Sequence, residues 1–455
     1  MTDFLLERFA QAADEAAVVF QDRTTRYGEL RSLIARWDGV IERDGIRAGD
    51  VIAYIGDFSP NTIALTLALA GRGCVLVPLS RELDPARIAE FETIARVNRV
   101  YRFDPDDNVI ESRKNTPGEP HPLVGQLRAT GNPGLILFSS GSTGRSKAAL
   151  LDLSEILKKF EVRKRVFRTA GFLMFDHIGG INTLFYVLSN LGTFFVMPSR
   201  APDAILAGIE KYRLELLPTS PTFIKLILLS EAYRDYDLSS LRLVTYGTEP
   251  MPQQILERFM QVMPHLRLQQ TYGLTEVGIL RSQSKDNGSL WMRIGGEGYQ
   301  WRVVDGILQI RSNATMLGYL NADAPITSDG WFITGDEVEV DGEYVRVLGR
   351  KSELINVGGI KVYPAEVEGV IEMLDFVESA AVRGEKNAIV GNVVCARVKL
   401  SNTCHLSHAD AIAKIRSWCS ERMERLKVPA KIEITEEAQH NIRFKKMRRA
   451  NPGQG

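Results

Sequence analysis

Apolar runs separated by helical stretches recur along the first part of the chain. In the first pass, an apolar run at 51–55 precedes a helical stretch at about 60–70 and a second apolar run at 73–78. Solid apolar runs of this kind are typical of strands covered on both faces. Repeated strand-helix-strand units predict parallel sheets with helical layers. The pattern returns at 171–175, 180–191 and 193–197, and again at 214–217, 221–230, 241–246, 252–262 and 266–270.

The pattern changes from about residue 290. Segments 303–310 and 338–349 alternate apolar and polar positions around Asp305-Gly306 and Asp341-Gly342, dipeptides that favour hairpin turns. Further on, Pro364 can open a helix with an apolar stripe. Two strand-like stretches, 380–383 and 392–399, and a helix at about 408–425 follow.

These patterns predict an α/β protein with two domains. The large N-terminal domain, 1–349, has sheets built from parallel βαβ units and a β-rich subdomain, and the small C-terminal domain, 350–455, is α+β. Segment 104–120 lacks periodicity and is expected to be a solvated surface loop.

Length and charge narrow the protein class. At roughly 100–200 residues per domain, the chain's 455 residues correspond to two to four domains. Lys and Arg total 56 and so do Asp and Glu, so no overall field draws the protein to nucleic acid or anionic lipid. With 44% hydrophobic and 25% charged residues, the composition is that of an ordinary globular protein.

The cysteines and apolar runs indicate the compartment. Cys74, Cys395, Cys404 and Cys419 are too few and too scattered for a disulfide framework, which fits a reducing compartment. His405 and His408 lie near two of them, but the spacing matches no zinc pattern, so we expect a loop and a core cysteine there. With no signal-like N-terminus and no run of 18 apolar residues, we expect a soluble cytoplasmic protein without a membrane span.

A glycine-rich loop follows the apolar strand at 135–138. Its sequence, SSGSTGRSK, combines glycines that free backbone N–H groups, hydroxyl donors and the terminal Lys147, which suits a triphosphate. A Walker loop needs Gly-Lys-Ser/Thr before a helix, whereas Lys147 follows Ser146 and leads into another strand. Composition alone leaves a phosphate loop and an ordinary turn as alternatives.

This loop resembles the phosphate loop of the adenylate-forming (AMP-binding) superfamily, which includes acyl- and aryl-CoA synthetases, peptide-synthetase adenylation domains and luciferases. Ser146 stands where that loop usually has proline. Further matches follow in the order that the superfamily uses, so the chain is identified as a member. They lie at 27–30, 175–180, 246–249, 271–276, 330–336 and 349–368.

The resemblance implies ATP and Mg²⁺ as cofactors and two half-reactions. A carboxylate attacks the α-phosphate of ATP to give an acyl-adenylate and pyrophosphate, and a thiol then attacks the mixed anhydride. Negative charge develops on the phosphoryl oxygens during displacement, so such a site needs positioning and cations.

The resemblance also assigns the nucleotide site. Thr275 would contact the α-phosphate, and Glu276 would hold Mg²⁺, a hard cation suited to oxygen ligands. Asp336, which in isolation is more typical of a turn residue after Gly335, would accept the ribose hydroxyls with help from Arg350. The phosphates would be held by the loop residues Ser139, Ser140, Gly141, Ser142, Thr143, Gly144 and Lys147. The adenine would lie among Gly247, Thr248, Glu249, Thr271, Tyr272 and Gly273, with Tyr272 stacked beside it.

His177 begins a predicted helix. A histidine on an apolar stretch is usually a core residue, but the resemblance implies that it borders the substrate carboxylate. Aligning on His-x-Gly-Gly places Ile178, rather than Asp176, where peptide-synthetase domains bind an ammonium group, which disfavours an α-amino acid. The resemblance makes the acyl pocket depend on 175–178, 246–248, Gln270 and Thr271, and the small-molecule carboxylic acid itself is not readable from the sequence.

The tail 441–449 carries five basic residues. Alone, such a run is typical of a solvated or nucleic-acid-facing segment, and a nucleic-acid-binding protein is the remote alternative function. The tail also resembles the superfamily's closing motif, with Lys446 as the catalytic lysine of adenylation, although Lys445 replaces the usual glycine and is the competing candidate.

The resemblance implies that the small domain rotates about a single residue, here Ser352. It would present the lysine for adenylation and then residues 356–360 for the thiol. The thiol acceptor is CoA or, alternatively, the phosphopantetheine arm of an acyl carrier protein. We therefore expect an AMP-forming acid-thiol ligase, an acyl-CoA synthetase, that requires no nucleic acid.

Overall fold

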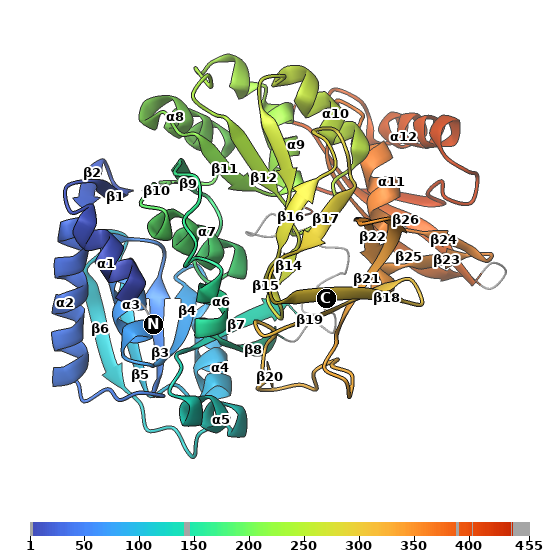
Figure 1. Ribbon diagram of the computed structural model, residues 1–455. Coiled ribbons are helices and arrows are strands. Elements are labelled where there is room, and N and C mark those ends of the chain that lie inside the picture. The colour runs from blue at the N-terminus through green and yellow to red at the C-terminus, as the bar shows by residue number, and fades with distance from the viewer. Residues whose placement is uncertain (1–2, 141–145, 388–390, 403, 438, 440–455) are drawn as a thin grey trace.

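The structure is a computed structural model that describes residues 3–140, 146–387, 391–402, 404–437 and 439. The described residues form two seven-stranded sheets, one six-stranded sheet, one three-stranded sheet and two short hairpins. Figure 1 shows the first sheet at the left, the second sheet across the upper part and the small domain at the right.

The first sheet has a parallel centre and antiparallel edges. Its strand order is β20-β8-β7-β4-β3-β5-β6, and β7, β4, β3 and β5 run parallel. The predicted unit at 51–78 is confirmed, since β3 and β4 flank α3, whose residues 62–70 are all buried. The strand bounds are β3 Val51–Gly56, β4 Val75–Ser80, β5 Arg99–Phe103, β6 Val109–Lys114, β7 Gly134–Ser140, β8 Ser146–Asp152 and β20 Gly318–Tyr319.

The second sheet has the order β13-β12-β11-β9-β10-β1-β2, and only β1 and β2 pair antiparallel. Its parallel strands confirm the third predicted pass, and they confirm the second pass except for the position of its first strand. The bounds are β1 Ala16–Phe20, β2 Arg23–Arg26, β9 Arg168–Gly171, β10 Thr193–Val196, β11 Leu216–Thr219, β12 Leu243–Tyr246 and β13 Arg267–Gln270.

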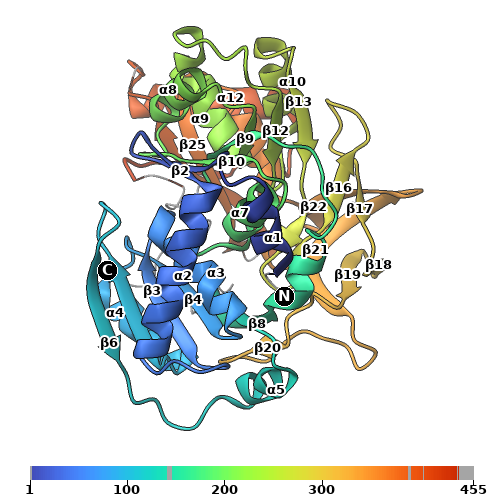
Figure 2. The same ribbon diagram turned by 60° about the vertical axis from the view of Figure 1, so that its left-hand side comes forward.

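Helices cover both sheets, and two of them are buried between layers. Residues 62–70 of α3 are all buried, as are most residues of α7, because these helices join both sheets in one continuous core. Helices α8, α9 and α10 enclose a separate core on the second sheet. Figure 2 shows α2 and α3 lying over the first sheet. The helix bounds are α1 Asp3–Gln11, α2 Tyr27–Arg43, α3 Pro60–Gly71, α4 Pro85–Ala95, α5 Pro122–Thr130, α6 Leu153–Lys158, α7 Ile178–Ser189, α8 Pro202–Tyr212, α9 Pro221–Ser230 and α10 Gln253–Val262.

The six-stranded antiparallel sheet confirms the predicted β-rich subdomain. Both Asp-Gly dipeptides turn hairpins, with Val304 opposite Ile307 and Asp341 opposite Tyr344. The bounds are β16 Arg281–Ser284, β17 Met292–Gly295, β18 Tyr299–Val304, β19 Ile307–Ser312, β21 Phe332–Asp341 and β22 Tyr344–Arg350.

The C-terminal part is a small α+β unit with its own apolar core. Its three-stranded sheet packs against α11 and α12, and Pro364 begins α11 as predicted. Figure 1 shows this unit beside α9 and α10. The bounds are β23 Ile355–Val357, β24 Ile360–Val362, α11 Pro364–Ile371, β25 Val377–Asn387, β26 Gly391–Leu400, α12 His408–Arg422 and β27 Lys431–Ile434.

Two sequence expectations are wrong. Segment 104–120 is not only a loop, because β6 pairs antiparallel with β5 inside it. The strand expected at 171–175 lies earlier, at β9, and Phe172 and Phe175 are buried by packing of the following loop. Strand β6 pairs although it is mostly exposed, and Phe172 and Phe175 are buried although they lie outside a strand. Hydrophobicity alone therefore missed the first strand and misplaced the second.

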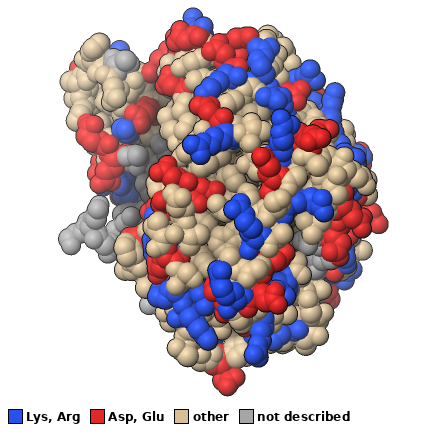
Figure 3. Space-filling view, turned by 90° about the vertical axis from the view of Figure 1, so that its left-hand side faces the viewer, with Lys and Arg blue, Asp and Glu red and all other residues tan. Residues whose placement is uncertain are grey.

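The surface carries both charge signs, as the balanced composition predicts. Figure 3 shows Lys and Arg interspersed with Asp and Glu over the face at the left of Figure 1. Within the described ranges, no helix has the length and apolar character needed to cross a membrane.

Candidate active site

Strands β7 and β8 carry the two ends of the glycine-rich loop. Ser139 pairs with Lys147 and Ser140 with Ser146, so the loop leaves one strand and enters its antiparallel neighbour. Its predicted phosphate ligands Gly141, Ser142, Thr143 and Gly144 lie outside the described residues. A loop that connects two paired strands differs from a Walker loop, as the sequence indicated.

Ser146, the residue in place of the usual proline, is buried and anchored. Its hydroxyl accepts a hydrogen bond from Arg87 at 2.8 Å, and its carbonyl accepts one from the Asn321 side chain at 2.9 Å. Asn321 also accepts from the backbone N–H of Ala148 at 3.0 Å. Ser146 is therefore held in place by packing and hydrogen bonds at the start of β8, directly before Lys147.

Tyr319 joins the lysine of this loop to a carboxylate from a distant segment. The Lys147 ammonium lies 4.9 Å from the centre of the Tyr319 ring, a cation–π distance. The Tyr319 hydroxyl donates to Glu276 Oε1 at 2.6 Å. The Tyr319 ring thus contacts a cation and its hydroxyl contacts a carboxylate, although Lys147 and Glu276 are distant in the sequence.

Glu276 lies at the tip of a two-stranded hairpin formed by β14 (Gly273–Leu274) and β15 (Gly278–Ile279). Its carbonyl accepts from the Met316 N–H at 2.7 Å, which ties the hairpin to the segment preceding Tyr319. Lys159 donates to the Ile279 carbonyl at 2.8 Å, and burial of this amine lowers its pKa to about 7. Thr275, on the same tip, is 9% exposed. The predicted α-phosphate and metal residues therefore lie side by side on a braced turn.

The residues Lys147, Tyr319 and Glu276 form one polar centre, and Asp336 forms a second. It is 6% exposed, and it faces Arg350 across the β21–β22 pair. Arg350 Nε lies 2.7 Å from Oδ1 of Asp336, and the Tyr272 hydroxyl donates to Oδ2 at 2.6 Å. Burial raises the pKa of Asp336, while Arg350 and Tyr272 act against that shift. The structure thus brings together three residues that the sequence assigned to the nucleoside.

Tyr272 is buried against this carboxylate. Burial and the neighbouring Asp336 raise its pKa well above the usual value for tyrosine, so it stays a neutral hydrogen-bond donor. A carboxylate offers about four lone-pair positions, so Asp336 can accept further hydrogen bonds beyond the two it already accepts. This capacity fits a ligand with neighbouring hydroxyl groups.

The loop after β12 holds the predicted adenine residues. A side chain at Gly247 would come within 2.5 Å of the Thr271 hydroxyl, so only glycine allows the loops after β12 and β13 to approach this closely. Thr248 is exposed and has a φ of +74°, whereas Glu249 accepts from the Thr222 N–H at 2.8 Å. Gly247, Thr248 and Thr271 are therefore near neighbours, and Glu249 points to the start of α9.

His177 caps helix α7. Its ring nitrogen Nδ1 accepts from the Gly179 N–H at 3.2 Å, which satisfies an N-terminal amide of the helix. The side chain is half-buried, and Asp176 beside it is buried. The predicted helix start is confirmed, and the capping bond fixes the ring in the loop that precedes α7.

Lys446 and Lys445 lie outside the described residues. Tyr319, Asn321 and Arg87 are structurally central but were not singled out from the sequence. Their roles depend on neighbours more than 40 positions away, and the only local signal is the aromatic-polar segment 318–321 between two loops.

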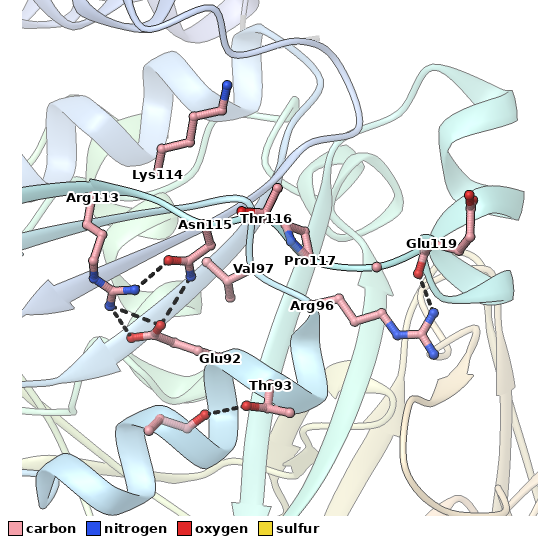
Figure 4. A pocket seen from close by; sticks show the side chains of 12 residues that line it. Glu92, Thr93, Arg96, Val97, Arg113, Lys114, Asn115, Thr116, Pro117 and Glu119 are labelled. Atoms are coloured by element: carbon pink, nitrogen blue, oxygen red, sulfur yellow. Dashed lines mark hydrogen bonds and ion pairs between the residues drawn. The ribbon is translucent and has the colours of Figure 1, made fainter.

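A hollow on the surface lies between α4, β6 and the segment before α5 (Figure 4), and none of the predicted site residues lines it. Its charges are largely satisfied from within. Arg113 and Asn115 bind the Glu92 carboxylate, and Arg96 donates to the Glu119 carbonyl. We assign the hollow no part in the chemistry.

Comparison with known proteins agrees with the site. The family model described as AMP-binding enzyme matches residues 5–320, and the model of the AMP-binding enzyme C-terminal domain matches residues 366–445. The chain is 27% identical to an indoleacetate–CoA ligase of Aromatoleum aromaticum over 84% of this chain and 85% of that protein. It is also 27% identical to a feruloyl-CoA synthase of an Amycolatopsis species over 90% of each.

Solved structures share the fold. An anthranilate CoA ligase, AuaEII, in complex with anthranoyl-AMP superposes with a TM-score of 0.82 at 20% identity, covering 98% of this chain and 95% of that one. ATP-bound MatB from Rhodopseudomonas palustris gives 0.77 at 22% identity, covering 97% and 96%. With a family model that spans most of the chain and this likeness in fold, the protein belongs to the AMP-binding enzymes.

Proposed function

We propose that this AMP-binding enzyme is an acyl-CoA synthetase that uses ATP to activate a carboxylic acid as its acyl-adenylate and then transfers the acyl group to CoA. The observation that carries the proposal is the contact of Tyr319 with both Lys147 and Glu276. This contact places the Lys147 ammonium, which can bind phosphate, near the Glu276 carboxylate, which can hold a phosphate-bound Mg²⁺.

The nucleotide fits the two polar centres. Asp336, held by Arg350 and Tyr272, accepts the ribose hydroxyls, and Gly247, Thr248, Glu249, Thr271 and Gly273 surround the adenine. Lys147, with Ser139, Ser140 and residues 141–144, binds the β- and γ-phosphates. Thr275 donates to the α-phosphate, where charge develops as the carboxylate attacks.

Magnesium would be held by Glu276. One protein carboxylate is enough, because Mg²⁺ usually takes one or two carboxylates and completes its ligands with substrate phosphates and water. When bound, Mg²⁺ neutralises charge on the phosphate oxygens. Tyr319 orients the carboxylate by donating to Oε1, so that Glu276 would be positioned to hold the metal.

The acid lies beside His177, and CoA is the preferred acceptor. The relatives named above are CoA ligases, which favours CoA over a carrier-protein phosphopantetheine. All four cysteines are free, which favours a reducing compartment such as the cytoplasm. The second candidate is an adenylation enzyme that loads a carrier protein. It differs from the first only in the acceptor, which is the phosphopantetheine thiol in place of the CoA thiol.

We propose that the large domain ends at 349 and that residues 350–455 form the small domain. Strand β22 ends at Arg350, and Ser352 lies in the short turn that follows, where a change in two backbone angles would redirect everything downstream. Lys446 then serves adenylation, and residues 356–360 serve thioester formation.

Replacing Tyr319 is expected to change the magnesium requirement. Tyr319→Phe keeps the ring against Lys147 but removes the hydrogen bond to Glu276, so the Mg²⁺ concentration for half-maximal pyrophosphate exchange should rise about 10- to 100-fold. Tyr319→Leu also removes the ring, and the KM for ATP should rise as well. Magnesium titrations of exchange, with calorimetry of ATP binding, measure both effects.

A matched control is Tyr101→Phe, since Tyr101 also donates to a carboxylate, Asp44, at 2.6 Å, but lies on β5, four strands away from β8 in the first sheet. It should leave the magnesium requirement unchanged. An equal requirement in the Tyr319→Phe variant and the unchanged enzyme would contradict the orienting role of the hydroxyl.

The function itself is tested by acid-dependent exchange of labelled pyrophosphate into ATP. A panel of short, long, aromatic and hydroxylated acids should include acids that start the exchange without any thiol. Adding CoA should then give acyl-CoA and AMP, whereas an acyl carrier protein should not be loaded. If no acid in the panel starts pyrophosphate exchange, the ligase function is contradicted. If only the carrier protein is loaded, the second candidate is favoured.

A further inference from the structure

A row of three buried polar side chains crosses the second sheet at the carboxyl ends of its strands. Thr219 is the register partner of Tyr246, and Tyr246 is the register partner of Gln270. Because paired positions point to the same face, the three side chains lie next to one another on β11, β12 and β13. They are 2%, 1% and 6% exposed, respectively.

Each of these side chains has a polar atom without a hydrogen-bond partner. The atoms are the Thr219 hydroxyl, the Tyr246 hydroxyl and Gln270 Oε1. Leaving a buried polar atom unpaired is unfavourable, and most such atoms in native proteins are paired. Burial with no compensating bond also raises the pKa of Tyr246. Three of them in one row indicate a place where a ligand supplies the bonds.

The position of the row points to the acid site. Tyr246 directly precedes Gly247, and Gln270 directly precedes Thr271, so the row borders the two loops assigned to the adenylate. The Thr271 N–H donates to the Tyr246 carbonyl at 2.7 Å, which joins the loops at this point. In open α/β sheets, ligands bind at the carboxyl ends of the strands.

We propose that this row binds a hydroxyl group of the acid substrate, remote from its carboxylate, so that the enzyme selects hydroxylated carboxylic acids. The proposal rests on the proposed function, because it assumes that the acid lies against these strands. The proposal assigns a specificity role to Thr219, and it makes the substrate hydroxyl the hydrogen-bond partner of Tyr246 and Gln270.

The chemistry of the row favours a hydroxyl. Gln270 Oε1 only accepts, so the ligand must donate to it, whereas the hydroxyls of Tyr246 and Thr219 donate or accept. One ligand hydroxyl can donate to Gln270 and accept from Tyr246 or Thr219 at the same time. A methyl or hydrogen in its place leaves all three atoms unpaired, and a site built to bind a hydroxyl rejects such an analogue strongly.

The test compares matched pairs of acids in the pyrophosphate-exchange assay. Suitable pairs are para-hydroxycinnamic with cinnamic acid, para-hydroxyphenylpropanoic with phenylpropanoic acid, and an omega-hydroxy fatty acid with its parent. We expect kcat/KM to favour the hydroxylated member of at least one pair by about 100-fold or more. Tyr246→Phe, Thr219→Val and Gln270→Met should each reduce this preference.

Thermal unfolding without ligand separates specificity from structure. Tyr246→Phe removes an unpaired buried hydroxyl, so Tm should stay equal or rise, and stabilisation by the hydroxylated acid with ATP should fall. Tyr236→Phe, beside the same core, is the matched control and should keep the preference. A lower Tm for Tyr246→Phe would show a structural bond and overturn the proposal.

The remaining outcomes separate the two proposals. Activation of both members of every pair with equal kcat/KM would overturn the hydroxyl preference and leave the ligase function standing. Preference for an amino or indole N–H over a hydroxyl would also overturn it. Failure of every acid to start exchange would contradict the ligase function, and the hydroxyl preference with it.

Discussion

Lys446→Ala is expected to slow acyl-adenylate formation by about 10² to 10³-fold while leaving thioester formation from a supplied acyl-adenylate intact. The lysine would provide one positive contact to the oxygen atoms on which charge develops, and loss of one such donor has an effect of this size. Thioester formation breaks a carbon–oxygen bond after the small domain has turned away, so it does not need this contact.

The two rates are measured separately on the same variant. Pyrophosphate exchange reports the first half-reaction, and release of AMP from added acyl-adenylate with CoA reports the second. Lys445→Ala is the matched comparison, one position earlier in the same basic tail. A large loss of exchange in the Lys445 variant alone would move the catalytic role to that residue, and loss of both half-reactions in the Lys446 variant would contradict the separation of roles.

Lys225→Met is expected to have the largest effect on stability. Lys225, in α9, lies 3.3 Å from Glu372 of the small domain, and their side chains are only 6% and 2% exposed. Lys225 also donates to the Glu378 carbonyl. Breaking a buried ion pair by removing one partner costs about 3–5 kcal/mol, because the remaining charge stays in a medium that solvates it poorly.

A second pair across the same contact provides the control. Arg258 of α10 lies 3.2 Å from Asp375, but these side chains are 46% and 87% exposed. Exposed pairs contribute about 0–1 kcal/mol, so Arg258→Ala should change little. Denaturant titration gives the free energy of unfolding, and hydrogen exchange of α11 reports its docking. Equal losses in the two variants would contradict the special role of the buried pair.

Much of the fold could be predicted from the sequence because burial and pairing coincide in its parallel strands. Strands β3 and β4 are buried along their whole length, so their apolar runs mark them directly. Strand β6 was missed because it is an edge strand that pairs only with β5 and exposes Val109 and Ile110 by 45% and 60%. An exposed edge has no hydrophobic pattern to detect.

Some residues of the candidate site could likewise be predicted from the sequence, and others could not. Asp336 and Arg350 were found through local motifs, and the strand register then brings them into contact. Tyr319 was missed because nothing near it in sequence reveals that β20 lies beside β8 and turns the hydroxyl toward Glu276. The row of Thr219, Tyr246 and Gln270 likewise exists only through the register of three strands, and Thr219 carried no signal of its own.

The central claim is that the acid carboxylate attacks the α-phosphate of ATP. It is tested most directly by supplying an acid whose carboxylate carries a heavy-oxygen label, together with ATP and CoA, and weighing the products by mass spectrometry. Attack at the α-phosphate transfers one labelled oxygen to AMP when the thiol releases it, so we expect singly labelled AMP and unlabelled pyrophosphate. Labelled inorganic phosphate with ADP, or unlabelled AMP, would contradict the acyl-adenylate mechanism.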